Sequence, residues 1–187
     1  MKNIVIFASG GGSNAEKIIE YFANSPVARV VLVLSNRPGA GVLFKAESHH
    51  VPTLTFTKEE LENGWVLRHL QAFNPHIIVL AGFLQKFPAD IIAAYPHKVI
   101  NIHPALLPKY GGKGMYGIHV HRAVLENNEP ESGITIHYVD ENYDEGNIIF
   151  QQSIALADCA TPEEVAAKVL ALEHEHFPKV IEKLLTE

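Results

Sequence analysis

Continuous apolar runs alternate with amphipathic segments along most of this chain. The runs cover residues 4–8, 30–34, 77–81 and 99–102, and none of them alternates strictly between polar and apolar positions. Strands that are buried on both faces show this pattern, which is typical of a parallel sheet covered by helices on each side. The helices predicted between the runs are Asn14–Phe22, Gly41–Ser48, Lys58–Phe73 and Pro88–Tyr95.

The pattern changes after the last of these runs. Residues 133–139 and 148–154 alternate more strictly, which favours an antiparallel extension of the sheet. A final helix is expected to begin at Thr161-Pro162-Glu163-Glu164, because a threonine cap, a proline and two acids are typical of a first turn. This helix should reach about Leu185, and Pro178 is a point at which it can bend.

No internal repeat, low-complexity segment or linker divides the 187 residues. We therefore predict one doubly wound α/β domain with a mainly parallel, open sheet and an antiparallel C-terminal extension. Ligands of such sheets bind beyond the carboxyl ends of the strands, where the winding reverses. This rule indicates the loops after Ala8, Ala81 and Ile102.

Composition narrows the range of partners. Hydrophobic residues make up 47% of the chain, the formal net charge is -6, and no basic tract stands out. Nucleic-acid binding needs clustered lysines and arginines, so we expect no nucleic-acid partner. No stretch approaches the roughly 20 apolar residues of a membrane span. The single Cys159 allows no internal disulfide and fits a reducing compartment. We expect a soluble, cytoplasmic monomer or weak homodimer.

The first apolar run leads into a glycine loop, Ser9-Gly10-Gly11-Gly12-Ser13-Asn14. Exposed backbone N–H groups, the start of a helix and the Ser13 hydroxyl would together form a cradle for a phosphate. An ordinary tight turn would need the same glycines. Gly10-x-Gly12-x-x-Ala15 also fits a dinucleotide fingerprint, and Arg37 follows the second strand where it could meet a 2′-phosphate. An NADP-binding oxidoreductase is therefore an alternative.

The last parallel strand delivers Asn101-Ile102-His103-Pro104. Positions two apart share a face of a strand, so Asn101 and His103 should project side by side at the edge where active sites lie. An amide donor beside an imidazole can hold a developing oxyanion. A loop of acids and glycine follows later, and Asp144 in it could orient the His103 ring and favour its charged form.

These segments together resemble the folate-dependent formyltransferases. The resemblance runs in order through the glycine loop, Ala81-Gly82-Phe83, residues 101–110 from Asn101 to Tyr110, and Tyr143-Asp144-Glu145-Gly146. It implies transfer of the formyl group of 10-formyltetrahydrofolate to the amine of 5-phosphoribosylglycinamide, a step of de novo purine synthesis. A cis peptide bond at Leu107–Pro108 is implied as well.

The resemblance also implies roles for individual residues. The catalytic residues would be Asn101, His103 and Asp144, and the phosphoribosyl substrate would be bound by Gly12, Ser13, Asn14 and Glu173. The folate would be bound by Lys58, Leu84, Gln85, Lys86, Phe87 and Asn101. The family often has Met-Arg where this chain has Leu84-Gln85, and an arginine where it has Lys58-Glu59; either Lys58 or Glu59 could replace that arginine.

Other members of the superfamily compete less well. Methionyl-tRNA and sugar-nucleotide formyltransferases usually carry additional C-terminal elements, and formyltetrahydrofolate hydrolase carries an additional N-terminal domain; we expect neither here. His119 and His121 stand two apart, but no further ligands at a recognisable spacing accompany them, so we predict no metal. The glycine-rich segment 111–117 is compatible with a mobile lid and with a solvent-exposed loop.

Overall fold

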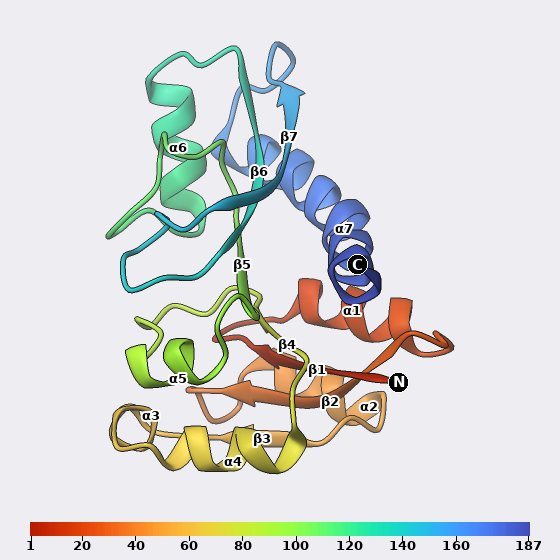
Figure 1. Ribbon diagram of the computed structural model, residues 1–187. Coiled ribbons are helices and arrows are strands. Elements are labelled where there is room, and N and C mark those ends of the chain that lie inside the picture. The colour runs from red at the N-terminus through yellow and green to blue at the C-terminus, as the bar shows by residue number, and fades with distance from the viewer.

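The computed structural model describes residues 1–187 and contains a seven-stranded sheet in the order β3-β2-β1-β4-β5-β6-β7 (Figure 1). The strands are β1 (Lys2–Phe7), β2 (Ala28–Ser35), β3 (Thr53–Thr55), β4 (Ile77–Leu80), β5 (Val99–His103), β6 (Glu131–Tyr138) and β7 (Ile148–Ala155). Strands β1 to β5 pair in parallel, whereas β6 and β7 are antiparallel to their neighbours. The predicted α/β fold and its antiparallel extension are confirmed.

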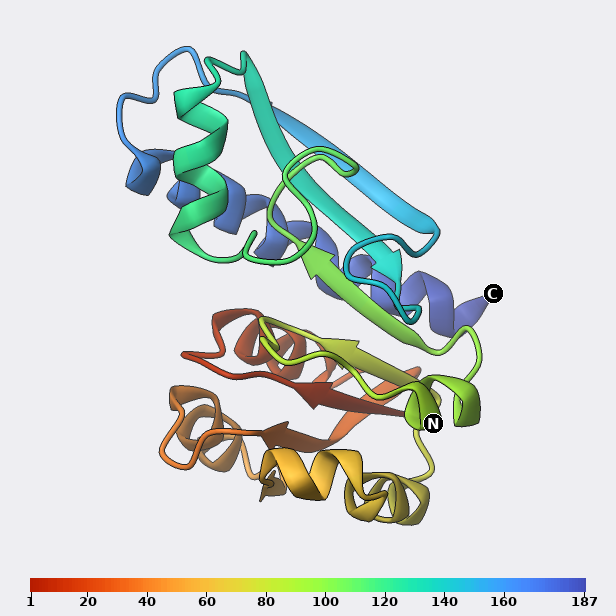
Figure 2. The ribbon, with the colours of Figure 1, turned by 90° about the vertical axis from the view of Figure 1, so that its left-hand side faces the viewer.

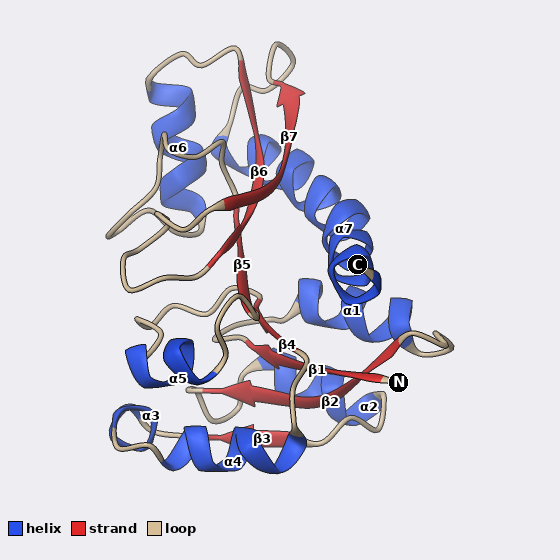
Figure 3. Cartoon of the chain, in the orientation of Figure 1, coloured by secondary structure: helices blue, strands red, loops and turns tan.

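Helices cover both faces of the sheet (Figure 3). They are α1 (Ser13–Phe22), α2 (Gly41–Ser48), α3 (Lys58–Glu62), α4 (Trp65–Phe73), α5 (Ala89–Ala94), α6 (Ile118–Glu126) and α7 (Pro162–Thr186). One core cluster joins α1, α2, α6 and α7 to the sheet, and a second joins α3, α4 and α5. The central strands supply side chains to both clusters, which is why they read as continuous apolar runs.

One helix prediction was wrong, and one helix was not predicted. The expected helix over residues 58–73 is two helices, because Gly64 has a φ of 81° that an α-helix cannot contain. The capping box of Thr57 and Glu60 nevertheless starts α3 as its sequence indicates. The sequence pattern also gave no prediction of α6, which follows the glycine-rich segment and ends at Glu126.

The long helix α7 connects distant parts of the fold. It runs without interruption across Pro178 and contacts α1, α6 and β6. Figure 2 shows α6 beside α7, and α7 contacts both β6 and β7. The α7–α1 contact matters for function because it brings Glu173 to the start of α1. None of the helices combines the length and apolar character that crossing a bilayer requires.

Candidate active site

A cavity of about 420 Å³ opens at the carboxyl ends of the central parallel strands. This volume lies within the range of small-molecule sites. Its wall includes most of the residues singled out from the sequence: Asn14, Leu84, Gln85, Lys86, Phe87, Asn101, His103, Asp144 and Glu173. The topology therefore brings together side chains from the first helix, two strand ends, a late loop and the last helix.

His103 and Asp144 meet in this cavity. The ring atom Nδ1 of His103 lies 3.5 Å from Oδ2 of Asp144. His103 is the last residue of β5 and is only 3% exposed, whereas Asp144 belongs to the loop between β6 and β7. The Gly112 backbone N–H donates to the same carboxylate oxygen at 3.0 Å. This donor fixes the carboxylate beside the imidazole.

The other ring nitrogen of His103 determines its tautomer. Nε2 lies 2.6 Å from the backbone carbonyl oxygen of Tyr110. A carbonyl oxygen only accepts hydrogen bonds, so Nε2 must carry a proton. In the neutral ring, Nδ1 therefore presents its lone pair toward Asp144 and the cavity. This nitrogen is the one that can gain and lose a proton.

The pKa values of both ionisable groups lie below their ordinary values, but for different reasons. Burial lowers the pKa of the His103 imidazole below its ordinary value, and the Asp144 carboxylate and the Tyr110 carbonyl offset this only in part. Burial alone would raise the pKa of Asp144, but the His137 ring, the His103 ring and the Gly112 N–H together bring it below its usual value. The resting pair is therefore an ionised carboxylate beside an imidazole that is mostly neutral at pH 7, whereas the sequence favoured a charged ring.

His137, which the sequence analysis did not identify as a site residue, connects Asn101 to this pair. Nδ2 of Asn101 lies 3.2 Å from Nε2 of His137, and this histidine nitrogen lies 3.6 Å from Oδ1 of Asp144. Nδ1 of His137 lies 2.8 Å from the carbonyl oxygen of Tyr138, so Nε2 is the ring nitrogen that faces both the amide of Asn101 and the carboxylate of Asp144. One N–H of Asn101 is thus committed, and its other N–H is free to donate into the cavity. The feature of the sequence that could have indicated His137 is its position two residues after Thr135 in a predicted strand, where both are polar and share a face.

The cavity wall also contains Asn14 and Glu173. The amide Nδ2 of Asn14 donates to Oε2 of Glu173 at 2.6 Å, and the amide oxygen of Asn14 has no hydrogen-bond partner. Burial raises the pKa of Glu173 to about 7, and the Asn14 hydrogen bond counters this only weakly. An unpaired acceptor beside a carboxyl that is half-protonated near neutral pH suits a ligand bearing hydroxyl groups.

The glycine loop leads to Asn14 but does not itself line the cavity. Asn14 lines the cavity, whereas Gly12 and Ser13 do not. Gly12 has a φ of 73°, and a side chain there would place Cβ 2.5 Å from the Val42 side chain of α2. Part of the requirement for glycine is therefore structural. Arg37, on which the dinucleotide alternative depends, is not part of the cavity wall either.

The segment after β4 forms another part of the cavity wall. Leu84 to Phe87 line the cavity, and the side-chain oxygen of Gln85 is buried without a partner. The Ser9 hydroxyl holds the start of this segment by accepting from the Leu84 backbone N–H at 3.0 Å. Lys58 lies apart from the wall, and its exposed ammonium pairs with Glu62 one turn along α3 at 3.7 Å.

The glycine-rich segment contributes directly to the cavity. Residues 112–117 form part of its wall, which favours a role in enclosing a ligand over that of a solvent-exposed loop. Gly112 adopts a φ of 90° where its N–H reaches Asp144. The Leu107–Pro108 peptide bond just before the segment is cis, as the resemblance implied.

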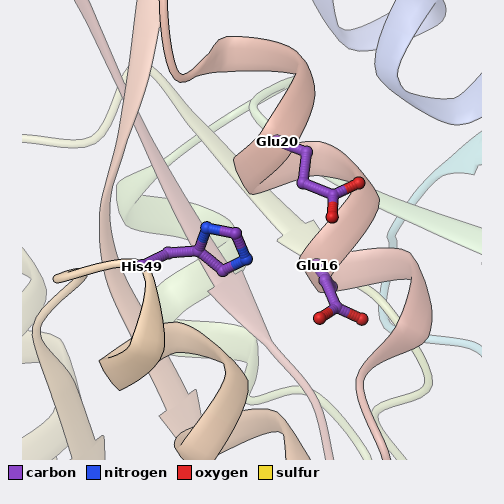
Figure 4. A group of neighbouring side chains, drawn as sticks. All are labelled: Glu16, Glu20 and His49. Carbon is purple, nitrogen blue, oxygen red and sulfur yellow. The ribbon is translucent and has the colours of Figure 1, made fainter.

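One group of three side chains has the composition of a metal site. Glu16 and Glu20 of α1 point toward His49 at the end of α2 (Figure 4). Their ligand atoms lie within 4.8 Å of one another. Each carboxylate already pairs with an ammonium group, Glu16 with Lys45 at 2.6 Å and Glu20 with Lys17 at 2.7 Å. A divalent cation would have to displace both lysines, and the group lies outside the cavity wall.

Comparison with known proteins gives a consistent result. The family model described as formyl transferase matches residues 2–181. The chloroplastic phosphoribosylglycinamide formyltransferase of Arabidopsis thaliana is 39% identical across 100% of this chain, which covers 66% of that relative. The Bacillus subtilis phosphoribosylglycinamide formyltransferase is 35% identical across 99% of this chain and 95% of its own length. The chain thus spans about two thirds of the plant relative's length and nearly all of the bacterial one.

Solved structures agree with the sequence relatives. The crystal structure of phosphoribosylglycinamide formyltransferase from Bacillus halodurans superposes with a TM-score of 0.89 at 32% identity, covering 100% of this chain and 96% of that one. The glycinamide ribonucleotide transformylase 1 of Symbiobacterium toebii gives a TM-score of 0.91 at 28% identity, with 100% and 88% coverage. The order of the strands, the cavity at their ends and these matches together show that the chain belongs to the formyl transferase family.

Proposed function

We propose that this protein transfers the formyl group of 10-formyltetrahydrofolate to the amine of 5-phosphoribosylglycinamide, in the de novo synthesis of purines. The observation that carries the proposal is the meeting of Asn101, His103 and Asp144 in one cavity. The names of the relatives support the substrate, since both the plant and the bacterial protein are phosphoribosylglycinamide formyltransferases. Both substrates would occupy this cavity, one at each end.

The wall residues suit the two substrates. The partly apolar segment from Leu84 to Phe87 would hold the pteridine end of the folate, and the unpaired oxygen of Gln85 would accept one of its N–H groups. At the other end, Asn14 and Glu173 would hold the ribose hydroxyls, and the start of α1 at Gly12 and Ser13 would receive the phosphate. Holding both substrates in register supplies much of the rate.

The reaction requires one proton to move between two nitrogens. The substrate amine attacks the formyl carbon, so a new C–N bond forms while the carbonyl oxygen becomes negative. The free N–H of Asn101 would donate to this oxygen. His103 Nδ1 would take the proton from the attacking nitrogen and pass it to the leaving N10 as the old C–N bond breaks. The products are the formamide and tetrahydrofolate.

The low pKa of His103 suits this sequence of events. A neutral ring can accept the proton, whereas a ring that is already charged cannot. Once protonated, the imidazolium faces the Asp144 carboxylate at 3.5 Å and the new oxyanion, and both stabilise it. Asp144 would thus act when charge develops, and no covalent enzyme intermediate is needed.

The wider setting is part of the proposal. A cytoplasmic location suits a chain whose one cysteine, Cys159, is free. We also propose that the reaction needs no metal, that no nucleic acid takes part, and that the protein is a monomer or a weak homodimer. Lys58 is exposed and does not line the cavity, so any role in binding folate would be through the outer, exposed part of that molecule.

A direct assay tests the proposal. Purified protein is incubated with 5-phosphoribosylglycinamide and 10-formyltetrahydrofolate, and formation of the formylated product and of tetrahydrofolate is followed together. We expect turnover that requires both substrates. Absence of turnover, with thermal stabilisation by NADP and not by either substrate, would support the oxidoreductase alternative instead.

A further inference from the structure

The loop containing Tyr110, which fixes the tautomer of His103, is held by a residue outside the catalytic cavity. The carbonyl of Tyr110 accepts from His103 Nε2, and the phenol of the same tyrosine donates to Oε1 of Glu129 at 2.8 Å. The Lys109 ammonium donates to this carboxylate oxygen at 3.0 Å. Glu129 follows the end of α6, where its backbone N–H is bonded to the Val124 carbonyl at 3.2 Å. A continuous chain of contacts therefore runs from α6 to the His103 ring.

Packing holds this loop only in part: Tyr110 packs against the main core cluster on one side and borders a second cavity. This cavity, of about 290 Å³, also borders Pro108, Lys109 and Glu129. Tyr110 also has a φ of 57°, a left-handed conformation that is unfavourable for a residue with a side chain. A strained residue beside empty space keeps its place only if other contacts fix it. The hydrogen bond to Glu129 is such a contact.

We propose that Glu129 is a positioning residue for His103: by holding the Tyr110 phenol, it keeps the Tyr110 carbonyl on Nε2 and so leaves Nδ1 free to take a proton. Glu129 touches neither the reacting atoms nor the catalytic cavity, so it acts only through Tyr110. The inference rests on the proposed function of His103. Lys109 is exposed, and its pairing with Glu129 contributes little.

The chain offers a matched control. Tyr21 of α1 donates its hydroxyl to Glu182 of α7 at 2.6 Å, so the same two residue types form the same contact in a different place. Neither residue lines the catalytic cavity. Loss of a tyrosine–carboxylate hydrogen bond at this place should cost stability without changing catalysis.

The kinetic test compares Glu129→Ala and Tyr110→Phe with Tyr21→Phe and Glu182→Ala. For the first two we expect kcat to fall roughly 10- to 100-fold with KM for both substrates near the wild-type value, because a misplaced group slows chemistry more than binding. Combining the first two should lower kcat no further, since both break one contact. Glu129→Gln should recover most of the activity because its amide oxygen still accepts from the phenol. The control variants should keep wild-type kcat.

A second readout does not depend on turnover. ¹⁵N NMR of histidine-labelled protein reports which ring nitrogen of His103 carries the proton. We expect the Nε2–H form in the wild type and in Glu129→Gln, and a mixture of tautomers in Glu129→Ala. An unchanged tautomer in Glu129→Ala, or a kcat loss no larger than in the Tyr21 control, would overturn the proposal. If the wild-type protein does not formylate 5-phosphoribosylglycinamide, the proposed function fails, and the tautomer still decides the role of Glu129.

Discussion

Asp144 and Glu173 are two carboxyl groups that line one cavity, the first partly buried and the second buried, and their pKa values move in opposite directions. Asp144 lies beside the rings of His103 and His137 and accepts from the Gly112 N–H, and its pKa is lowered. Glu173 has a single donor, the amide of Asn14, and burial raises its pKa to about 7. The difference teaches that burial sets the cost of a charge, and that the neighbouring donors decide whether the charge persists.

This difference in pKa matches the roles proposed for the catalytic residues around Asp144 and for the substrate-binding residues around Glu173. The catalytic end needs a permanent negative charge to stabilise an imidazolium as it forms. The substrate end needs groups that both donate to and accept from hydroxyls, and a protonated carboxyl beside an amide can do both. The predictions below test the two ends separately.

Replacing Asp144 with Asn should have the largest effect. Asparagine keeps the shape of the side chain but removes the charge that stabilises the protonated His103. We expect kcat to fall roughly 10²- to 10⁴-fold with KM for both substrates nearly unchanged. Steady-state kinetics measures both. Asp158→Asn, which alters an exposed carboxylate paired with Lys168, serves as the control and should keep wild-type kcat. If KM instead rose by a similar factor while kcat stayed intact, Asp144 would be a substrate-binding residue and not a catalytic one.

Glu173 should make stability depend on pH. Its folded-state pKa of about 7 lies above the ordinary value of 4.5, so the unfolded chain releases the proton first as pH rises. The folded state therefore loses stability between about pH 4.5 and 7. We expect this carboxyl alone to cost roughly 2 to 3 kcal/mol between pH 5 and pH 8. Glu173→Gln should remove that loss.

Urea unfolding at the two pH values measures this effect. The wild type and Glu173→Gln should have similar free energies of unfolding at pH 5, and the variant should be the more stable one at pH 8. Equal stability of the two proteins at both values would mean that Glu173 is ionised in the folded state throughout. The two carboxyl groups would then not differ as described.

Asn14→Ala should have a smaller effect, confined to the substrate end. The variant removes the amide that contacts Glu173 and offers an unpaired oxygen to the cavity. We expect KM for the phosphorylated substrate to rise about tenfold, the value of one lost hydrogen bond, with kcat and the folate KM nearly unchanged. A drop in kcat alone would place Asn14 with the catalytic residues.

The sequence predicted the parts of the site that depend on local rules. A buried strand followed by glycines indicated the start of α1, and the two-residue spacing placed Asn101 and His103 on one side of β5. Both follow from backbone geometry over a few residues. The mainly parallel sheet and its antiparallel extension could likewise be predicted from the change in hydrophobic pattern, whereas the order of the strands was not predicted.

The long-range pairs could not be predicted from the residues alone. His137 meets Asn101 because β6 pairs with β5 in one particular register, and a shift of one residue would turn its side chain to the other face. Asn14 and Glu173 are 159 positions apart and meet only because α7 packs on α1.

His103→Ala gives the most direct test of the account, because every proposed step passes through Nδ1 of this ring. Formyl transfer is measured in a single turnover with both substrates bound, and the affinity for each substrate is measured separately by calorimetry. We predict a rate at least about 100-fold below the wild type with both affinities nearly unchanged. A variant that binds both substrates and transfers the formyl group at close to the wild-type rate would contradict the account.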